Sequence, residues 1–332
     1  MRAELPSSTH LLIFPHIRVQ NANAISSPLT HGFPSITAFI GFMWALERKT
    51  CSIGLDIMFN AVGVVCHDFQ EQVADSGFTH IFNQTRNPIE KDGKTAPIIE
   101  EGRIHLDISL LFGVSYKGRK DSDEIEEDLK KIAALVQNMR IAGGSILPPS
   151  QAMVKRYSPY YMEWHRSSDE NKEFRQICYR LLPGYALVER PDLISDRLKS
   201  MQEVEPKTTA LEAWLSLSGV NWRCKNENIE QESNKKHTAE WQHDRDNGWI
   251  VPIPVGYGAI GKEQAAGSVS SARDNSIPFQ SVESLFSIGE WIAPFHLKNP
   301  NELLWYAFPT QEKESLSEKT VYRCYNFYYP DS

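Results

Sequence analysis

Residues 11–49 read LLIFPHIRVQNANAISSPLTHGFPSITAFIGFMWALERK, and this stretch decides the fold. Positions 11–19 alternate with the two-residue period of a β-strand. Ile13, Ile17 and Val19 would share one face of that strand and turn toward the core. The opposite face would carry the aromatic Phe14, His16 and the basic Arg18. The first part of the stretch therefore predicts a strand with one buried face.

The second part of the stretch predicts a helix preceded by a long polar loop. Apolar residues recur at helical spacing from Ile36 to Leu46, and Ser35 stands where an N-cap belongs. Two basic residues follow, as suits the negative end of a helix dipole. Residues 20–35 hold two Asn, three Ser and two Pro, so they predict a loop rather than part of the core.

Three further patterns extend this strand, loop and helix into a domain. Residues 61–69 form an apolar run typical of a buried strand, and residues 78–114 predict a long hairpin with a charged tip. Residues 121–140 predict an amphipathic helix with a capping box at Asp121. The Gly143–Gly144 pair ends that helix. Together they predict an α+β sandwich of the ferredoxin or RNA-recognition (RRM) type, with antiparallel strands on one side and two helices on the other.

The chain has 332 residues, which suits one elaborated domain or two unequal ones. We expect a ferredoxin-like RNA-binding domain over residues 1–150. Residues 151–248 are helical in pattern, charged and polar, and predict a mostly helical insertion lobe. Residues 249–332 regain apolar strands and would pack back on the core.

Charge and hydropathy exclude several classes of protein. The net charge of −7 argues against non-specific coating of nucleic acid. Residues 1–120 hold 11 basic and 11 acidic residues, so a polyanion site is expected there, with acidic faces elsewhere for protein partners. No apolar run approaches the ~20 residues that span a bilayer. The sequence therefore predicts a cytoplasmic protein without a membrane partner.

Signatures of common enzymes are absent from the sequence. The five cysteines are odd in number and widely spaced, which predicts reduced thiols rather than a disulfide or zinc framework. The sequence has no HExxH, GxSxG, P-loop or dinucleotide motif after a strand. We therefore expect neither a metal site nor a bound cofactor.

The loop after the first strand has two interpretations. In one, its Asn and Ser side chains only satisfy the backbone of a structural turn. In the other they offer amides and hydroxyls to base edges and phosphates ahead of a helix N-terminus, with Arg18 supplying charge. The residues at issue are Asn21, Asn23, Ser26 and Ser27.

Basic residues at three further places predict contacts to a nucleic-acid backbone. Arg86 and Arg103 flank the predicted hairpin tip, so an extended arm would carry cations along a strand. Arg140 precedes Gly143–Gly144, and a cation beside a glycine turn suits a phosphate. In the loop, His31 could bind phosphate or backbone, or act as a general base on an RNA 2′-hydroxyl with His105 or a tyrosine as partner.

Several blocks resemble one family closely. They are the opening stretch and IFNQTRNPIEKDGKTAPIIEEGRIHLDISLLFGV, MRIAGGSILP, RLLPGYALVER, GWIVPIPVGYGAI, SARDNSIPFQSVESLFSIGEWIAP and ELLWY. In this order they resemble the second Csy subunit of type I-F CRISPR surveillance (Cascade) complexes, a Cas-five-type family of the RAMP superfamily.

The resemblance implies a non-catalytic antiviral-defence subunit with an RNA-recognition-like fold and a hairpin thumb over residues 81–104. Such a subunit holds the five-prime handle of the CRISPR RNA (crRNA) and pairs tightly with the large subunit that recognises the protospacer-adjacent motif (PAM). A terminal Cas-seven-type backbone subunit and target DNA near the PAM would be further partners. The predicted RNA-binding residues are Arg18, Asn21, Asn23, Ser26, Ser27, His31, Arg86, Arg103, Arg140, Gly143, Gly144 and Arg273.

Two alternatives remain open from the sequence. One is a RAMP-type endoribonuclease that processes precursor crRNA through His31 or His105. The other is a protein-interaction module without RNA contacts of its own.

Overall fold

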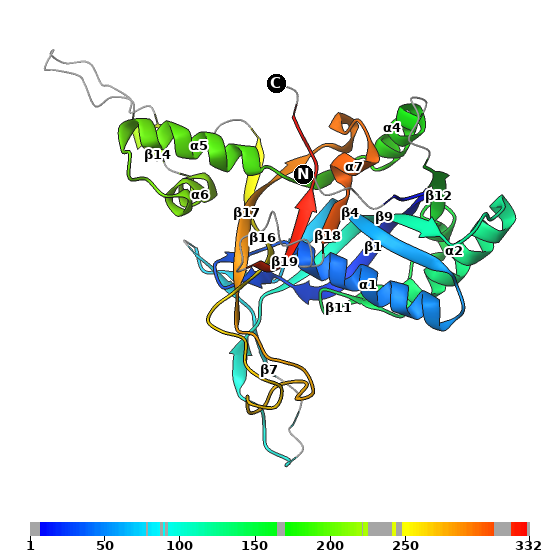
Figure 1. Cartoon of the computed structure of the whole chain (residues 1–332), viewed down its shortest axis with the longest axis horizontal. Helices are drawn as coiled ribbons and strands as arrows, with labels where there is room; N and C mark the ends of the chain where they lie inside the picture. Colours follow the sequence, from blue (N-terminus) through cyan, green and yellow to red (C-terminus); the bar gives the residue numbers. More distant parts are fainter. Residues whose placement is uncertain are drawn as a thin grey trace, which may run out of the picture.

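The computed structural model describes residues 7–77, 79–86, 89, 92–164, 170–220, 222–224, 241–243, 248–308 and 320–330. Within these ranges, eleven strands form one antiparallel sheet with helices on both of its faces (Figure 1). A mixed α+β fold with a large antiparallel sheet is therefore confirmed. In the same ranges, no helix combines the length and the apolar character needed to cross a bilayer.

The first half of the sheet is built around two very long pairings. Strands run in the order β10-β11-β1-β9-β4, and β12 also pairs with β1. Along the chain, the order of the main elements is β1, α1, β4, β9, α2, β11. The strands of this half are β1 (His10–Asn23), β4 (Ile57–Glu71), β9 (Arg103–Tyr116), β10 (Arg140–Ile141), β11 (Gly144–Leu147) and β12 (Tyr160–Glu163).

Two helices cover one face of this half, α1 (Ile36–Ser52) and α2 (Ser122–Gln137) (Figure 1). Both predicted caps are confirmed: Ser35 accepts the backbone N–H of Thr37, and Asp121 forms a capping box with Glu124. Apolar residues of both helices pack against alternate residues of the strands. Helix α4 (Glu170–Arg180) and the short α7 (Pro300–Leu303) cover the opposite face.

The prediction that Ile13, Ile17 and Val19 share one face of β1 is wrong, because a β-bulge interrupts the alternation of its side chains. His16 has a positive φ of 51°, and the pairing register with β9 shifts between Phe14 and Ile17. Phe14 and Ile17 consequently face the same helices, whereas Ile13 packs into the cluster on the other face. The first residues of β1 are thus buried on both sides.

The second half of the sheet closes into a ring. From β4 the order continues β13-β17-β16-β19-β18, and β18 pairs again with β4 through Trp305 and Val62. Each strand of this ring therefore pairs with a neighbour on both of its sides. Its other members are β13 (Tyr185–Glu189), β16 (Trp249–Ala259), β17 (Val282–Ile292), β18 (Trp305–Phe308) and β19 (Thr320–Asn326).

A buried carboxylate joins three strands of this ring. Glu189 is 2% exposed and accepts hydrogen bonds from Ser287 Oγ at 2.7 Å and Arg323 Nη2 at 2.6 Å. Burial raises the pKa of Glu189, and Arg323 opposes that rise. The ion pair therefore ties β13 to β19 inside the fold.

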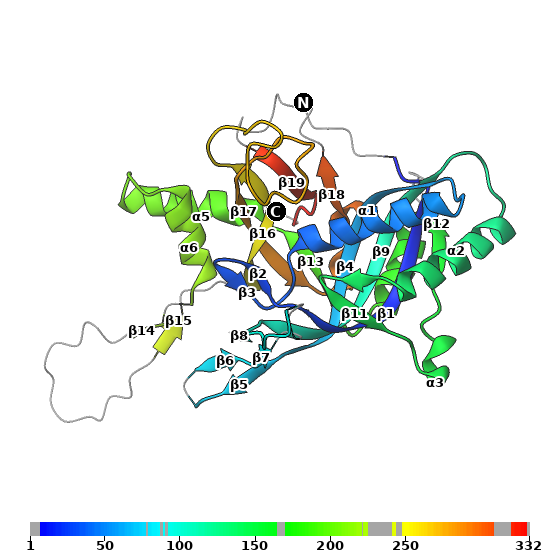
Figure 2. The same ribbon diagram turned by 90° about the horizontal axis from the view of Figure 1, so that it is seen from below.

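The segment between β4 and β9 projects beyond the sheet as two short ribbons, which we call the arm (residues 72–102) (Figures 1 and 2). The ribbons are β5 (Val73–Asp75) with β6 (His80–Phe82), and β7 (Gln84–Arg86) with β8 (Ile98–Glu100). The prediction of a single hairpin over residues 78–114 is wrong, because the returning strand β9 pairs with β1 and β4 in the main sheet.

A helical projection leaves the ring next to β13. It consists of α5 (Pro191–Val204) and α6 (Ala210–Ser218), which pack on each other, and α6 also contacts β16 and β17. Trp214 anchors α6, because its indole N–H donates to the carbonyl of Ser287 at 3.0 Å. The remaining described elements are β2 (Ile25–Ser27), β3 (Thr30–His31), α3 (Gln151–Val154), β14 (Trp222–Cys224), β15 (Trp241–His243) and a 3-10 turn at Pro294–His296.

Candidate nucleic-acid interface

Four of the residues predicted to bind RNA line one hollow of about 390 Å³ at the base of the arm. They come from the end of β1, the start of β9 and the β10–β11 hairpin, and the paired strands bring them together. The four are Asn21, Arg103, Arg140 and Gly143; the other lining residues are Gln20, Gln72, Asn83, Glu101 and Ser145.

Asn21 reaches the hollow because β1 bulges a second time. The register with β9 shifts between Val19 and Ala22, and Asn21 has a φ of 56°, a conformation that asparagine tolerates better than most residues. Its backbone N–H donates to His105 Nδ1 at 3.1 Å. No described residue bonds the Asn21 side-chain amide, which leaves both its donor and its acceptor for a ligand.

Two arginine side chains line the hollow, and they differ in whether a carboxylate already binds them. Arg103 donates from Nε to Glu101 Oε2 at 2.9 Å, and its side chain is 35% exposed. Arg140 is exposed, and no described residue forms an ion pair with it. An anion would therefore meet one unpaired guanidinium and one that is already oriented by a carboxylate.

The two glycines beside Arg140 have different roles. Gly143 has a φ of 78° and open space where a Cβ would stand. Gly144 packs against β1, because a Cβ there would lie 2.7 Å from the backbone nitrogen of Ala22. Gly143 consequently permits the turn and leaves its outer side clear, while Gly144 permits close packing beneath it.

Three of the predicted loop residues hold the loop itself. The Asn23 amide donates to the carbonyl of Ile25 at 2.7 Å and accepts the N–H of Ile25 at 3.1 Å. Ser26 Oγ donates to the carbonyl of Thr30, and Ser27 is buried and accepts the N–H of Thr30 at 3.0 Å. These side chains act as the structural-turn interpretation describes. In addition, Ser35 Oγ bonds the carbonyl of Pro254, so the start of α1 rests on β16.

The remaining predicted cations lie outside this hollow. Arg18 pairs in register with Asp107 and lines a separate hollow beside Tyr157. Arg86 is exposed on the arm, and Arg273 is exposed in the loop between β16 and β17. The arm and that loop project in the same direction in Figure 1, but Figure 2 separates them.

His31 lines a second and more apolar cleft, of about 480 Å³, which sequence reasoning missed. Its Nδ1 lies 3.0 Å from Glu71 Oε1, and its ring meets the ring of Phe82 edge-on. Five aromatic residues from separate segments line this cleft: Phe33, Phe69, Tyr185, Trp249 and Trp291. Tyr185 and Trp249 stand at the starts of β13 and β16, and no pattern in the sequence indicates that these rings meet.

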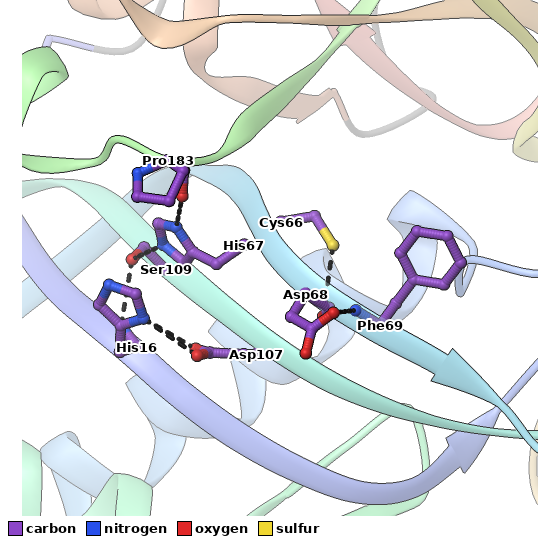
Figure 3. A network of polar contacts seen from close by, with 8 residues as sticks. All are labelled: His16, Cys66, His67, Asp68, Phe69, Asp107, Ser109 and Pro183. Atoms are coloured by element: carbon purple, nitrogen blue, oxygen red, sulfur yellow. Dashed lines mark hydrogen bonds and ion pairs between the residues drawn. The ribbon is translucent and has the colours of Figure 1, made fainter.

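A cluster of polar side chains links three neighbouring strands of the sheet, β1, β4 and β9 (Figure 3). His67 Nδ1–H donates to the carbonyl of Pro183 at 2.7 Å, and its Nε2 accepts from Ser109 Oγ at 2.6 Å. Ser109 Oγ in turn accepts the backbone N–H of His16, whose ring stacks on His67 with centroids 4.0 Å apart. Asp107 lies 3.1 Å from His16 Nδ1. Burial lowers the pKa of His67, which agrees with a neutral imidazole in this arrangement.

The cluster does not have the geometry of a nucleophilic site. Ser109 is fully buried and both of its hydrogen bonds are used to hold the two histidines. Cys66 is also buried, and burial together with Asp68 raises the pKa of its thiol to about 12. Among the described residues, no group of three or more His, Cys, Asp or Glu is placed to hold a metal ion.

Comparison with known proteins defines the class and then the family. A family model described as CRISPR-associated protein (Cas_Csy2) matches residues 12–324, which makes the chain a CRISPR-associated protein. It is 41% identical over 306 residues to CRISPR-associated protein Csy2 of Pseudomonas aeruginosa (strain UCBPP-PA14), covering 91% of this chain and 93% of that relative. The chain therefore belongs to the Csy2 family, which confirms the predicted resemblance to the second Csy subunit of type I-F complexes.

Proposed function

We propose that the chain is the crRNA-binding, non-catalytic subunit of a type I-F Csy surveillance complex, and that it holds the five-prime handle in the hollow at the base of the arm. The observation that carries this proposal is the meeting of Asn21, Arg103, Arg140 and Gly143 around one hollow. They come from three separate segments of the chain, so their meeting depends on the fold.

The topology supports an RNA-binding fold of the RAMP type. The element order β1, α1, β4, β9, α2, β11 and the strand order β11-β1-β9-β4 agree with a ferredoxin-like arrangement. The arm contains the thumb proposed over residues 81–104 except for its last two residues, which begin β9. Its exposed Arg86 suits contact with a phosphate beyond the hollow.

The chemistry of the hollow suits a single-stranded RNA end. The free amide of Asn21 can donate to and accept from the edge of an unstacked base. Arg103 and Arg140 suit phosphates, which set the register of the strand. Among the described residues that line the hollow, one cation, Arg140, is unpaired, so binding would depend on the fit of the strand more than on charge.

A non-catalytic role is supported by the two candidate histidines. His31 is engaged with Glu71, and Nδ1 of His105 accepts the backbone N–H of Asn21. No described contact joins one histidine to the other. The alternative, a RAMP-type endoribonuclease, predicts site-specific cleavage of precursor crRNA that His31→Ala or His105→Ala abolishes; uncut precursor after incubation with the assembled complex excludes it.

Partner surfaces are expected away from the hollow. The large Csy subunit, a terminal Cas-seven-type subunit and target DNA near the PAM remain the proposed partners in the cytoplasm. The exposed apolar side chains of α6, Leu211 and Leu215, would favour a protein partner on the helical projection.

Handle RNA and two double variants test the proposal. Arg103→Ala with Arg140→Ala should weaken handle binding by about ten- to a hundredfold, since hydrogen bonds to charged groups are lost. Arg48→Ala with Arg119→Ala removes two exposed cations away from the hollow and is the matched control. Equal affinity in both double variants, measured in the full chain and in the assembled complex, would contradict the proposal.

A further inference from the structure

The second cleft is lined by flat aromatic surfaces that remain accessible. Phe69 is 53% exposed, Tyr185 46% and Trp249 44%. Tyr185 and Trp249 meet edge-on with centroids 5.4 Å apart, and Trp291 lies behind Trp249 and against Phe33. Rings held by their neighbours and still open on one side suit a planar ligand.

The lining of the cleft carries two carboxylates, Asp68 and Glu71, beside two histidines and the hydroxyls of Ser26, Thr30 and Ser35. Asp68 Oδ1 accepts the N–H of Phe69, and Glu71 Oε1 is engaged with His31. Among the described residues, Asp68 Oδ2 and Glu71 Oε2 have no hydrogen-bond partner. The lining residues include neither Lys nor Arg. A phosphate would therefore be repelled from this cleft, whereas a neutral planar group with N–H donors fits it.

The cleft adjoins the hollow along two neighbouring strands. Glu71 and Ile104 line the cleft, while Gln72, which follows Glu71, and Arg103, which precedes Ile104, line the hollow. The N–H of Gln72 donates to the carbonyl of Arg103 at 2.7 Å and joins the two places. The end of β1 lines the hollow through Asn21, and the segment that follows β1 lines the cleft through Ser26 and Thr30. Because adjacent residues of a strand face opposite sides, an RNA strand with its phosphates in the hollow would pass the end of this strand pair to place a base in the cleft.

From these observations we infer that the cleft binds one unpaired nucleobase that carries an exocyclic amino group. The base stacks on Phe69 and Trp249, and its amino group donates to Asp68 or Glu71. The source of the base, the crRNA handle, rests on the proposed function. Adenine, cytosine and guanine fit this description; uracil lacks the amino group.

Handle RNA that carries 2-aminopurine at one position at a time tests this, because stacking on aromatic rings quenches the probe. With wild type, one position should be quenched on binding. Phe69→Ala and Trp249→Ala should relieve that quenching and weaken binding by about fivefold or more. Phe69→Tyr keeps the ring and should keep the quenching. Circular dichroism melting identifies any variant that fails to fold.

The proposal for the hollow and the inference for the cleft can be contradicted separately. If RNA binds but no position responds to Phe69→Ala or Trp249→Ala, the cleft inference is overturned while the proposed function stands. Arg103→Ala with Arg140→Ala should weaken binding, yet at saturation the same position should stay quenched.

Free 2-aminopurine riboside, which has no phosphate, decides the case in which handle RNA does not bind at all. That result would end the proposed function. Quenching of the riboside by wild type and Phe69→Tyr, and not by Phe69→Ala, would still support a nucleobase cleft; no difference between these proteins would overturn it. Adenosine should displace the riboside at least about fivefold better than nebularine, which lacks the amino group. Equal displacement would contradict recognition of the amino group by the two carboxylates.

Discussion

Gly144 lies so close to Ala22 that a Cβ at position 144 would stand 2.7 Å from the Ala22 nitrogen. The contact fixes the β10–β11 turn against β1 and so sets the position of Arg140 relative to Asn21. Two of the three nearest obstructing atoms, the nitrogen and Cα of Ala22, belong to the backbone and cannot move aside as a flexible side chain would; the third is Cγ1 of Val19. The shape of the hollow therefore depends on a glycine that does not line it.

Gly144→Ala should consequently destabilise the fold. We expect a loss of about 1–3 kcal/mol in the free energy of unfolding, as for other overpacked sites. Gly41→Ala is the control, because Gly41 lies in α1 with open space around it and should gain about 0.5–1 kcal/mol. Urea titration of both variants measures the two changes, and equal stabilities would show that the turn relaxes away from β1.

The ion pair of Glu189 and Arg323 makes stability depend on pH. Arg323→Ala would leave a buried carboxylate without its cation and should cost about 3–5 kcal/mol at neutral pH. Burial already raises the pKa of Glu189 above its unfolded value, so the folded state holds this proton more tightly. Tighter binding of this proton by the folded state adds to the free energy of unfolding at low pH. That contribution is lost as the pH rises through the pKa of Glu189 in the folded state.

Loss of Arg323 raises the pKa of Glu189 further, because the opposing charge has gone. The difference in unfolding free energy between wild type and Arg323→Ala should therefore be smaller at pH 5 than at pH 8. Glu189→Gln in the same chain removes the buried charge and should recover part of the loss at pH 8. A difference that stays constant between the two pH values would mean that Arg323 contributes packing alone.

Local features of this fold could be predicted from the sequence because their causes are local. The caps at Ser35 and Asp121 are satisfied within three residues, and both form as expected. The bulge at His16 depends on Ser109, which accepts the His16 N–H from a strand more than ninety residues away along the chain. No pattern within residues 11–19 could indicate that partner.

The candidate site also has a part that the sequence indicated and a part that it did not. Asn21, Arg103, Arg140 and Gly143 each stand out in their own segment as an amide, a cation or a glycine in a turn, and only their meeting required the structure. The aromatic cleft had no comparable signal, because segments as distant as Phe33 and Trp291 complete it. Each of its rings, taken singly, has the pattern of an ordinary core residue.

Asn21 and Asn23 should differ when each amide is removed. Asn23→Ala removes both hydrogen bonds to Ile25 and should cost about 1 kcal/mol of stability, with little change in RNA sequence preference. Asn21→Gly keeps the positive φ and removes the free amide, so stability should hold while discrimination against a changed handle base falls by about 1–3 kcal/mol. Thermal melting and binding to native and base-substituted handles separate the two effects. A loss of discrimination in Asn23→Ala equal to that in Asn21→Gly would contradict this division.

Arg86 should act through charge alone, since it is exposed on the arm without a partner among the described residues. Arg86→Ala should weaken binding equally for native and scrambled handles, because a phosphate contact carries no sequence information. Each phosphate contact to a single strand contributes about 0.7 to the slope of log K against log salt, so the slope should fall by about that amount. Arg119→Ala removes an exposed cation outside the arm and should leave the slope unchanged. Binding measured between low and moderate salt decides: an unchanged slope in Arg86→Ala would remove the arm from the path of the RNA.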